Sequence, residues 1–216
     1  MKLIIFIHTC EAYETKRAKL LEESWALADI DIVFITDNPT SKLLNHIYVG
    51  AYEKYWTYHP ETVKKMIEIW LTNYADYDYY MMVDDDSYVF VNKLKHFLSS
   101  LNSQDCLMIG DVINWIKRDP SHWNPDKQWW LGGGAGIVFT KSALIEFKRL
   151  YTTNEITIKN HDVWLHDLYL KSTSIKRVHC AGFHQHPSII KPTDELISIH
   201  LNHDMSLLKQ FPPYNV

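Results

Sequence analysis

The opening 36 residues contain two apolar, β-rich runs separated by an amphipathic segment. Residues 3–7 and 30–36 each have the composition of a buried strand, because parallel strands are covered on both faces and are apolar nearly throughout. Between them, residues 14–28 intersperse apolar and charged side chains in the pattern of an amphipathic helix. A β-α-β unit implies a parallel sheet with a ligand crevice at the carboxyl ends of its strands. We therefore predict an α/β fold with a mixed, mostly parallel central sheet flanked by helices.

Similar patterns continue along the rest of the chain. Helices are expected over residues 61–74, 92–101, 141–151 and 161–171, and strands over residues 78–83, 106–112 and 136–140. Residues 114–130, which are rich in proline and tryptophan, are expected to form an extended loop of the kind that often carries function. Since no linker or internal repeat divides residues 1–216, we expect a single domain.

The charge balance limits the classes of ligand. The net charge is -4 with His neutral, and 46% of the residues are hydrophobic, which is typical of a globular protein. A nucleic-acid-binding protein usually has a basic excess or a basic stripe, and neither is present. An anionic ligand such as a diphosphate would be repelled by this chain unless a cation or local hydrogen-bond donors held it, so an anionic substrate implies a metal ion.

Cysteine usage and the N-terminal segment bear on the compartment. Three cysteines, Cys10, Cys106 and Cys180, are too few for a disulfide framework and show no CxxC spacing. The apolar run before His8 has only five residues, which is shorter than the core of a signal peptide or a membrane span. We therefore expect a cytoplasmic chain without an anchor, and leave open whether it is one domain of a longer protein.

Three consecutive aspartates follow the apolar strand expected at residues 78–83. Asp84, Asp85 and Asp86 repel one another, and they are best kept where a hard cation such as Mg²⁺ or Mn²⁺ neutralises them. A solvated acidic turn is the alternative interpretation. The position at the end of a strand favours a metal site, and a divalent ion that bridges two phosphates would stabilise the leaving group in sugar transfer from a nucleoside diphosphate sugar.

Seven segments in chain order resemble the Fringe-like β1,3-glycosyltransferases, over roughly residues 3–190. The central one is Val83-Asp84-Asp85-Asp86-Ser87-Tyr88-Val89, which resembles the DxD segment of that family. The others are Arg17 eight residues before Trp25, Phe34-Ile35-Thr36-Asp37 (F-x-T-D), Lys64 twenty residues before Asp84, Gly133-Gly134-Ala135-Gly136 (GGAG), His161-Asp162-Val163 (D-D-V) and Phe183-His184-Gln185-His186 (F-H-S-H).

The resemblance implies a GT-A fold, a UDP-sugar donor, Mn²⁺ or Mg²⁺ as the metal, and an inverting transfer of a hexose to a glycan or glycoprotein hydroxyl. It assigns Asp86 as the direct metal ligand, with Asp84 facing the metal or the ribose. His184 is the expected third ligand, and His186 is the alternative because it would point the opposite way on a strand. Asp85 either contacts the donor or points inward and braces the turn.

The resemblance also assigns the general base. Asp162 lies in the segment that holds the base of the family, although His161 stands where the family tends to have an acid. A carboxylate here would take the proton of the attacking hydroxyl. The alternative is a helix N-cap, since Asp162 precedes the apolar residues Val163 to Leu165.

The remaining candidates surround the expected crevice. Gly133 and Gly134 would allow a backbone to approach the donor closely, with a plain tight turn as the alternative, and the preceding Trp129-Trp130 favours a loop that faces a sugar. Thr9 and Asp37 follow the first two strands and could contact uracil or ribose. Arg17 and Lys64 could balance the diphosphate, and for all four a solvated surface position is the alternative.

Three other protein classes compete with a glycosyltransferase. A sugar nucleotidyltransferase would have a glycine-rich, basic loop after the first strand, where this chain has His8-Thr9-Cys10-Glu11. A non-catalytic carbohydrate-binding module would keep aromatic residues but would not need the carboxylates and histidines together. A metal phosphohydrolase would need a nucleophilic Asp after the first strand, and the chain has no G-x-S-x-G nucleophile elbow for serine catalysis.

Overall fold

A seven-stranded sheet forms the centre of the molecule. The computed structural model describes residues 1–26, 31–50, 59–114, 129–154, 160–185 and 195–211. The strands lie in the order β10 (Lys176–His179), β6 (Leu107–Gly110), β9 (Ile137–Thr140), β4 (Tyr79–Asp84), β1 (Leu3–His8), β2 (Asp31–Thr36) and β3 (His46–Tyr48). Six of these strands run in one direction, and β9 is antiparallel to both of its neighbours, β4 and β6. The predicted mixed, mostly parallel sheet is confirmed.

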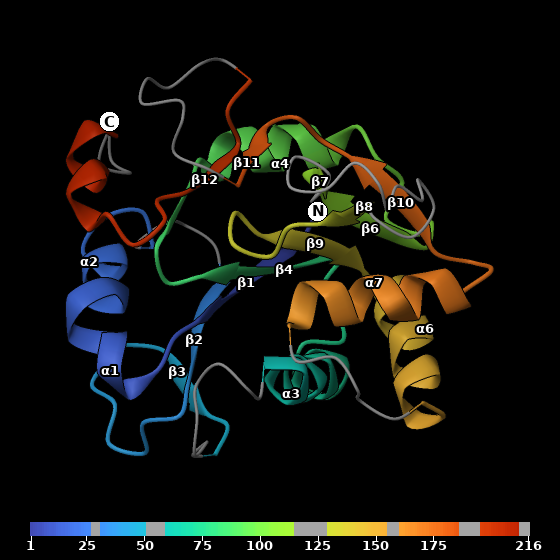
Figure 1. Cartoon of the computed structure of the whole chain (residues 1–216), viewed down its shortest axis with the longest axis horizontal. Coiled ribbons are helices and arrows are strands. Elements are labelled where there is room, and N and C mark those ends of the chain that lie inside the picture. Colours follow the sequence, from blue (N-terminus) through green and yellow to red (C-terminus); the bar gives the residue numbers. More distant parts are fainter. Residues whose placement is uncertain (27–30, 51–58, 115–128, 155–159, 186–194, 212–216) are drawn as a thin grey trace, which may run out of the picture.

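Both faces of the sheet are covered, which explains the continuous apolar runs in its strands. Because side chains alternate along a strand, Ile4 and Phe6 enter one hydrophobic cluster while Leu3, Ile5 and Ile7 enter the other. The first cluster is closed by three helices, α3 (His59–Asn73), α6 (Lys141–Thr152) and α7 (His161–Lys171), which lie together below the sheet in Figure 1. The second cluster is closed by the N-terminal helical segment and by α4 (Val91–Ser99).

The first helical segment is shorter and less regular than the sequence pattern indicates. Residues 14–28 were expected to be helical, whereas α1 (Glu11–Tyr13) continues into a π-helical stretch (Glu14–Ala18) and then into α2 (Lys19–Glu22). Residues 27–30 lie outside the described part of the chain. The π-helical stretch widens the helix where Arg17 turns inward, and such insertions are frequent at functional sites.

Two small sheets were not expected from the sequence. One contains β11 (Phe183–His184), β12 (Ser198–His200) and β5 (Ser87–Val89), and it carries the C-terminal part of the chain back to the end of β4. The other pairs β7 (Val112–Asn114) with β8 (Trp129–Leu131), so the expected loop of residues 114–130 begins and ends in strands, and its residues 115–128 are not described. A 3-10 helix (Met205–Gln210) ends the described chain.

Two further expectations concern cysteines and membranes. Cys10, Cys106 and Cys180 are all unpaired, as expected from their spacing. Within the described ranges, none of the helices has the length and apolar character needed to cross a membrane.

Gly136 is a position where the fold requires glycine. Its φ is +103°, and a Cβ there would lie 2.4 Å from the Met81 side chain and 3.0 Å from the Met82 carbonyl. Gly50 provides a matched control, because its φ of +102° is similar but a Cβ would meet only the flexible end of Lys65. We predict that Gly136→Ala lowers the free energy of unfolding by about 1–3 kcal/mol more than Gly50→Ala does. Urea denaturation measures both, and equal losses would contradict the packing argument.

Candidate active site

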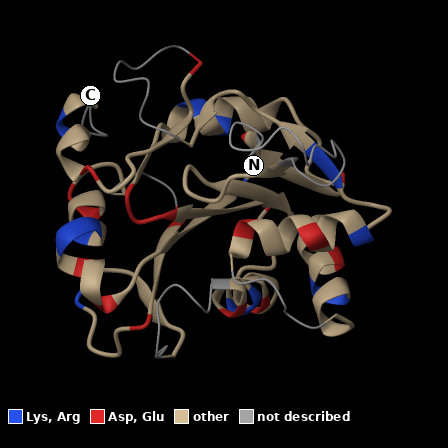
Figure 2. Cartoon of the chain, in the orientation of Figure 1, with Lys and Arg blue, Asp and Glu red and all other residues tan. Residues whose placement is uncertain are grey.

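The carboxyl ends of β1, β2 and β4 bring polar side chains to one edge of the sheet. Thr9 follows β1 and is held by a hydrogen bond from its main-chain N–H to the Ile35 carbonyl of β2 (2.9 Å). Asp37 follows β2 and accepts a hydrogen bond from the main-chain N–H of Glu11 (2.8 Å). Asp84 is the last residue of β4, and Asp85 and Asp86 follow it at the same edge, in the red turn that continues from the end of this strand in the left half of Figure 2.

Asp85 points into the protein. Its side chain accepts hydrogen bonds from Thr9 Oγ1 (2.6 Å) and from the Arg17 guanidinium (3.3 Å). Burial raises the pKa of Asp85 to about 6, although the Thr9 hydrogen bond and the charge of Arg17 oppose this effect. Since Asp85 is only 1% exposed, this geometry fits the interpretation in which Asp85 braces the turn and does not favour a donor contact.

Asp86 is surrounded by nitrogen atoms. Its Oδ1 lies 3.0 Å from His200 Nε2, and its Oδ2 accepts hydrogen bonds from the main-chain N–H and the Nδ1 of His203 at 2.9 and 2.7 Å. Burial alone would raise the pKa of Asp86, but His200, Arg17 and His203 hold it at about 2. Asp86 is therefore a carboxylate at neutral pH.

The turn that follows β12 is adapted to Asp86. Asn202 and His203 have φ values of 51° and 72°, and the left-handed region is costly for residues other than glycine. The main-chain N–H of Leu201 donates to the Asp86 carbonyl at 2.8 Å, and that of His203 donates to the Asp86 side chain. These bonds to Asp86 help to offset the cost of the two left-handed residues.

Asp84, Asp86 and His200 form the group that could hold a metal ion. One ligand atom from each lies within 4.8 Å of the other two, and carboxylate oxygen with imidazole nitrogen is a suitable donor set for Mn²⁺. Burial raises the pKa of Asp84 to about 7; His200 opposes this shift, and the charges of Asp86, Asp85 and Asp162 add to it. A cation at this point would favour the charged form of Asp84.

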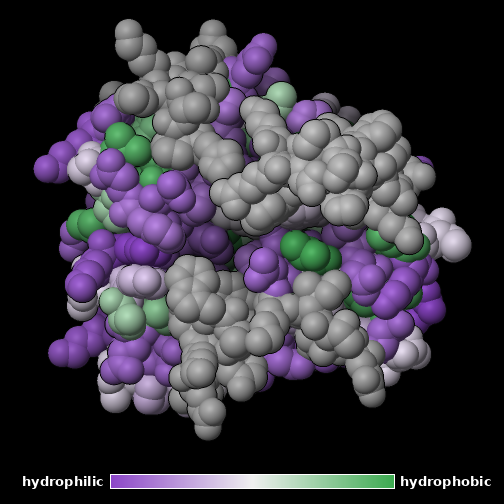
Figure 3. All heavy atoms as spheres, in the orientation of Figure 1, coloured by the Kyte–Doolittle hydropathy of each residue, from purple (hydrophilic) through white to green (hydrophobic). Residues whose placement is uncertain are grey.

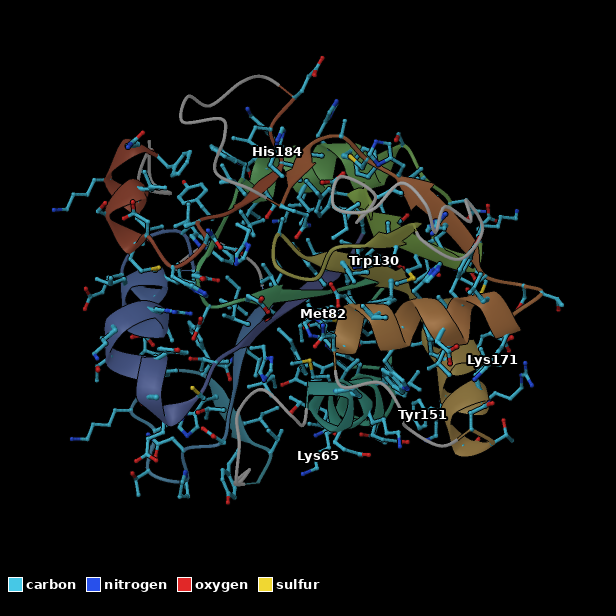
Figure 4. The ribbon with its side chains drawn as sticks, in the orientation of Figure 1. Lys65, Met82, Trp130, Tyr151, Lys171 and His184 are labelled. Carbon is cyan, nitrogen blue, oxygen red and sulfur yellow. The ribbon has the colours of Figure 1, made fainter. Side chains whose placement is uncertain are left out.

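The structure brings His200, and not His184, to the two aspartates. In the parallel pair of β11 and β12, His184 is aligned with Ile199. Paired residues point to the same face, and neighbours along a strand point to opposite faces, so His184 and His200 lie on opposite faces of this small sheet. Figure 4 shows His184 on β11. His186, the other candidate, lies outside the described residues.

Arg17 contacts the aspartates directly. Its guanidinium lies 3.3 Å from Asp85 and 3.4 Å from Asp86, and it stacks on the Tyr13 ring at 3.7 Å. With a side chain that is only 11% exposed, Arg17 balances the charge of the aspartate turn. The balancing of a diphosphate by Arg17 stays a prediction, and the guanidinium already lies against two carboxylates.

Lys64 lies on α3 and forms an ion pair with Glu61 of the same helix. Its ammonium is 3.4 Å from Glu61 and 5.5 Å from the centre of the Tyr151 ring on α6. It lines a hollow with Val49 and Gly50, beyond the end of β3. These contacts link α3 to α6 and do not join Lys64 to the aspartate turn.

The glycine loop before β9 closes tightly around the site. A Cβ on Gly133 would lie 2.1 Å from His161, and one on Gly134 would lie 2.7 Å from His200. The Gly134 carbonyl accepts hydrogen bonds from Ser87 Oγ (2.7 Å) and from the main-chain N–H of Asp84 (3.4 Å). The loop is therefore packed against the metal-binding group and is more than a connecting turn.

Asp162 lies in the first turn of α7, whose N-cap is Asn160. The N-cap alternative is therefore wrong, and Asp162 is the second helical residue. Its carboxylate accepts hydrogen bonds from the main-chain N–H groups of Val163 and Gly133 and from the Trp130 indole (3.1 Å). Burial raises the pKa of Asp162 above the usual range of aspartate, and these three donors oppose the shift.

Trp130 precedes the loop that was expected to face a sugar, and that expectation stays a prediction. Trp130 itself is only 8% exposed and directs its N–H to Asp162. Figure 4 shows Trp130 above the first turns of α7. In the space-filling view, the described side chains to the left of the central hollow are mostly hydrophilic (Figure 3). The charge of Asp162 acts on Asp84, so Asp162 lies near the candidate metal ligands.

One comparison with known proteins shows the family of this chain, and a second shows its fold. The model of the Fringe-like family matches residues 1–203. The chain belongs to the Fringe-like family. The fold is similar to the crystal structure of a glycosyltransferase involved in the glycosylation of the major capsid of PBCV-1, with a TM-score of 0.52 and 14% sequence identity. The aligned region covers 98% of this chain and 100% of the PBCV-1 glycosyltransferase chain. This likeness shows a shared GT-A fold, and the family membership supports a glycosyltransferase.

The resemblance identified the family but missed two residues of this Fringe-like site. His200 follows an alternating pattern in which Ile197, Ile199 and Leu201 are buried while Ser198 and His200 share the other face. This alternation indicates a strand, and it was the feature of the sequence from which the position of His200 on a strand could have been predicted. Trp130 could not have been assigned to Asp162, because the two residues are 32 positions apart and meet only when β8 packs against α7.

We predict that the ion pairs of Arg17 with Asp85 and Asp86 contribute strongly to the free energy of unfolding of this Fringe-like chain. Arg17→Met leaves Asp85 and Asp86 without their guanidinium partner, and breaking a buried ion pair typically costs about 3–5 kcal/mol. Arg149→Met is the control, since it removes a guanidinium paired with Glu146 at the surface, where ion pairs contribute little. Urea denaturation at pH 7 should show a much larger loss for Arg17→Met, and similar losses would contradict the bracing role.

Proposed function

We propose that this Fringe-like chain is a metal-dependent, inverting glycosyltransferase that moves a hexose from a UDP-sugar to a hydroxyl of a glycan or glycoprotein. The observation that carries the proposal is the placement of Asp84, Asp86 and His200 at the carboxyl edge of the sheet, with the Asp162 carboxylate close enough to raise the pKa of Asp84. Crevices at this edge are where ligands bind in α/β folds.

The donor set fits Mn²⁺ or Mg²⁺. Two carboxylates and one imidazole are available, and His200 Nδ1 donates to the Gln185 carbonyl at 3.3 Å. This bond leaves Nε2 as the ligand atom and orients the ring, as second-sphere carbonyls do for metal-binding histidines. When bound, the divalent ion would stabilise the negative charge that develops on the diphosphate leaving group.

The protein groups around the crevice would hold the donor. Asp37 lies at a strand end where the nucleoside is expected, whereas the neighbouring Thr9 is 1% exposed and its hydroxyl is engaged by Asp85. The main chain of Gly134 borders His200, and that of Gly133 borders His161. Since Arg17 is engaged by the aspartate turn and Lys64 by Glu61, the metal ion is the expected counter-charge for the diphosphate.

Asp162 is the proposed general base. It would take the proton of the acceptor hydroxyl as the hydroxyl oxygen bonds to the anomeric carbon, while the bond from that carbon to the diphosphate oxygen breaks and UDP leaves. Inversion follows from this single displacement. Because burial raises the pKa of Asp162, its base form is lost as the pH falls, and this loss begins at a higher pH than for an ordinary aspartate.

Titration of UDP by calorimetry tests the donor and metal assignments together. We predict binding in the presence of Mn²⁺ and its loss with EDTA. His200→Ala should lose the metal-dependent binding, whereas His184→Ala, the matched control on the opposite face, should retain it. Loss in His184→Ala alone would restore His184 as the ligand. Equal binding with Mn²⁺ and EDTA would refute the metal requirement, and no UDP binding would favour a carbohydrate-binding module.

Asp162→Asn tests the base. The amide keeps the size of the side chain but cannot accept the proton, so turnover with a UDP-sugar and acceptor should fall by roughly 10²–10⁴-fold while UDP binding is unchanged. Asp167→Asn on the same helix, where the carboxylate pairs with Lys171 at the surface, should leave turnover unaffected. Undiminished turnover in Asp162→Asn would exclude Asp162 as the base.

A further inference from the structure

Gln185 holds both ends of the glycine loop with its side-chain amide. Its Oε1 accepts a hydrogen bond from the main-chain N–H of Ala135 (3.1 Å), and its Nε2 donates one to the Gly132 carbonyl (3.0 Å). Gln185 is only 7% exposed, and each polar atom of its amide has a partner of the matching kind. A buried amide that makes both bonds fixes the turn between residues 132 and 135 firmly.

The two residues between those hydrogen bonds are the ones that touch the site. Gly133 donates its main-chain N–H to the Asp162 carboxylate. The Gly134 carbonyl accepts from Ser87 and Asp84, and the Gly134 Cα packs against the His200 ring. The position of the loop therefore determines the position of the N–H that supports Asp162 and the space in which His200 lies.

The main chain of Gln185 also reaches the metal-binding group directly. Its carbonyl is the acceptor for His200 Nδ1 at 3.3 Å, and the opposite nitrogen of that ring lies 3.0 Å from Asp86. The contact between Gln185 and Gly132 is so close that a Cβ on Gly132 would lie 2.4 Å from the Gln185 side chain. Gly132 is thus the residue that allows Gln185 to lie here.

We propose that Gln185 is a positioning residue for the transfer reaction. Its side-chain amide fixes the glycine loop that supports Asp162, and its main-chain carbonyl orients His200. One residue thereby sets the general base relative to the metal-binding group. This proposal rests on the proposed function, because positioning has meaning only if both groups act in the same reaction.

Gln185→Met is the variant that tests this role. Methionine keeps the length of the side chain and the carbonyl to His200, but it removes both bonds to the loop. Asn45→Leu is the matched control, since it removes a similar side-chain amide bond to the Ile32 carbonyl (2.6 Å) away from the site. If Gln185→Met does not fold, Gln185→Glu is measured instead, because it keeps an acceptor for Ala135 and loses only the donor to Gly132.

Three readouts separate positioning from general stability. The stoichiometry of UDP binding counts intact sites, the electron paramagnetic resonance signal of free Mn²⁺ gives metal affinity, and turnover is expressed per UDP-binding site. We expect Gln185→Met to lower Mn²⁺ affinity and turnover per site by roughly 10–100-fold each, because the loop that packs against His200 and supports Asp162 loses both of its bonds to the amide, and loss of outer-sphere support typically has an effect of this size. Asn45→Leu should lower only the thermal midpoint.

The outcomes distinguish this proposal from the proposed function. If the wild-type chain binds neither Mn²⁺ nor UDP, the proposed function fails. If the wild type is active and Gln185→Met behaves like Asn45→Leu, with turnover per site and Mn²⁺ affinity unchanged, Gln185 has only a structural role and the positioning proposal is overturned.

Discussion

The rest of the site depends on how three adjacent carboxylates are tolerated at the end of a buried strand. Each aspartate meets a different environment. Asp85 is turned inward to Thr9 and Arg17, and Asp86 is surrounded by His200, His203 and Arg17. Asp84 is left among like charges that oppose its ionisation. The protein thus surrounds two of the carboxylates with its own cationic and hydrogen-bonding groups, and Asp84 is the one whose charged form a cation would favour.

In the seven-stranded sheet only β9 is antiparallel to its neighbours, and its direction explains why the glycine loop lies at this site. In β1, β2 and β4, the strand ends reach the crevice edge, whereas β9 runs in the opposite direction and therefore begins there. The residues that precede β9, Gly132 to Gly136, consequently lie beside the residues that follow β4. The direction of β9 therefore brings the glycine loop to the aspartate turn, although the two are distant in sequence.

Periodicity was sufficient for the long elements and failed for the short ones. α6 and α7 were expected within one residue of their observed ends, and α6 shows a clear one-sided apolar pattern over three turns. β5, β11 and β12 have three residues or fewer, and only around β12 does an alternating pattern extend further, from Ile197 to Leu201. His200 and Gln185 depend on the pairing of these short strands, and for that reason the choice of histidine could not be made from spacing. The aspartate turn was recognisable because its charge is local in sequence.

The candidate metal site draws on parts of the chain that are far apart in sequence, since Asp86 contacts His203, 117 positions later. A chain leaves the ribosome from its N-terminus, so the aspartate turn emerges long before the histidines that surround Asp86. During that interval β1, β2 and β4 can pair, and Arg17 is already present to balance the turn. A nascent chain would bring His200 to the aspartates only when β12 pairs with β5, so the last of the described strands completes the proposed metal site.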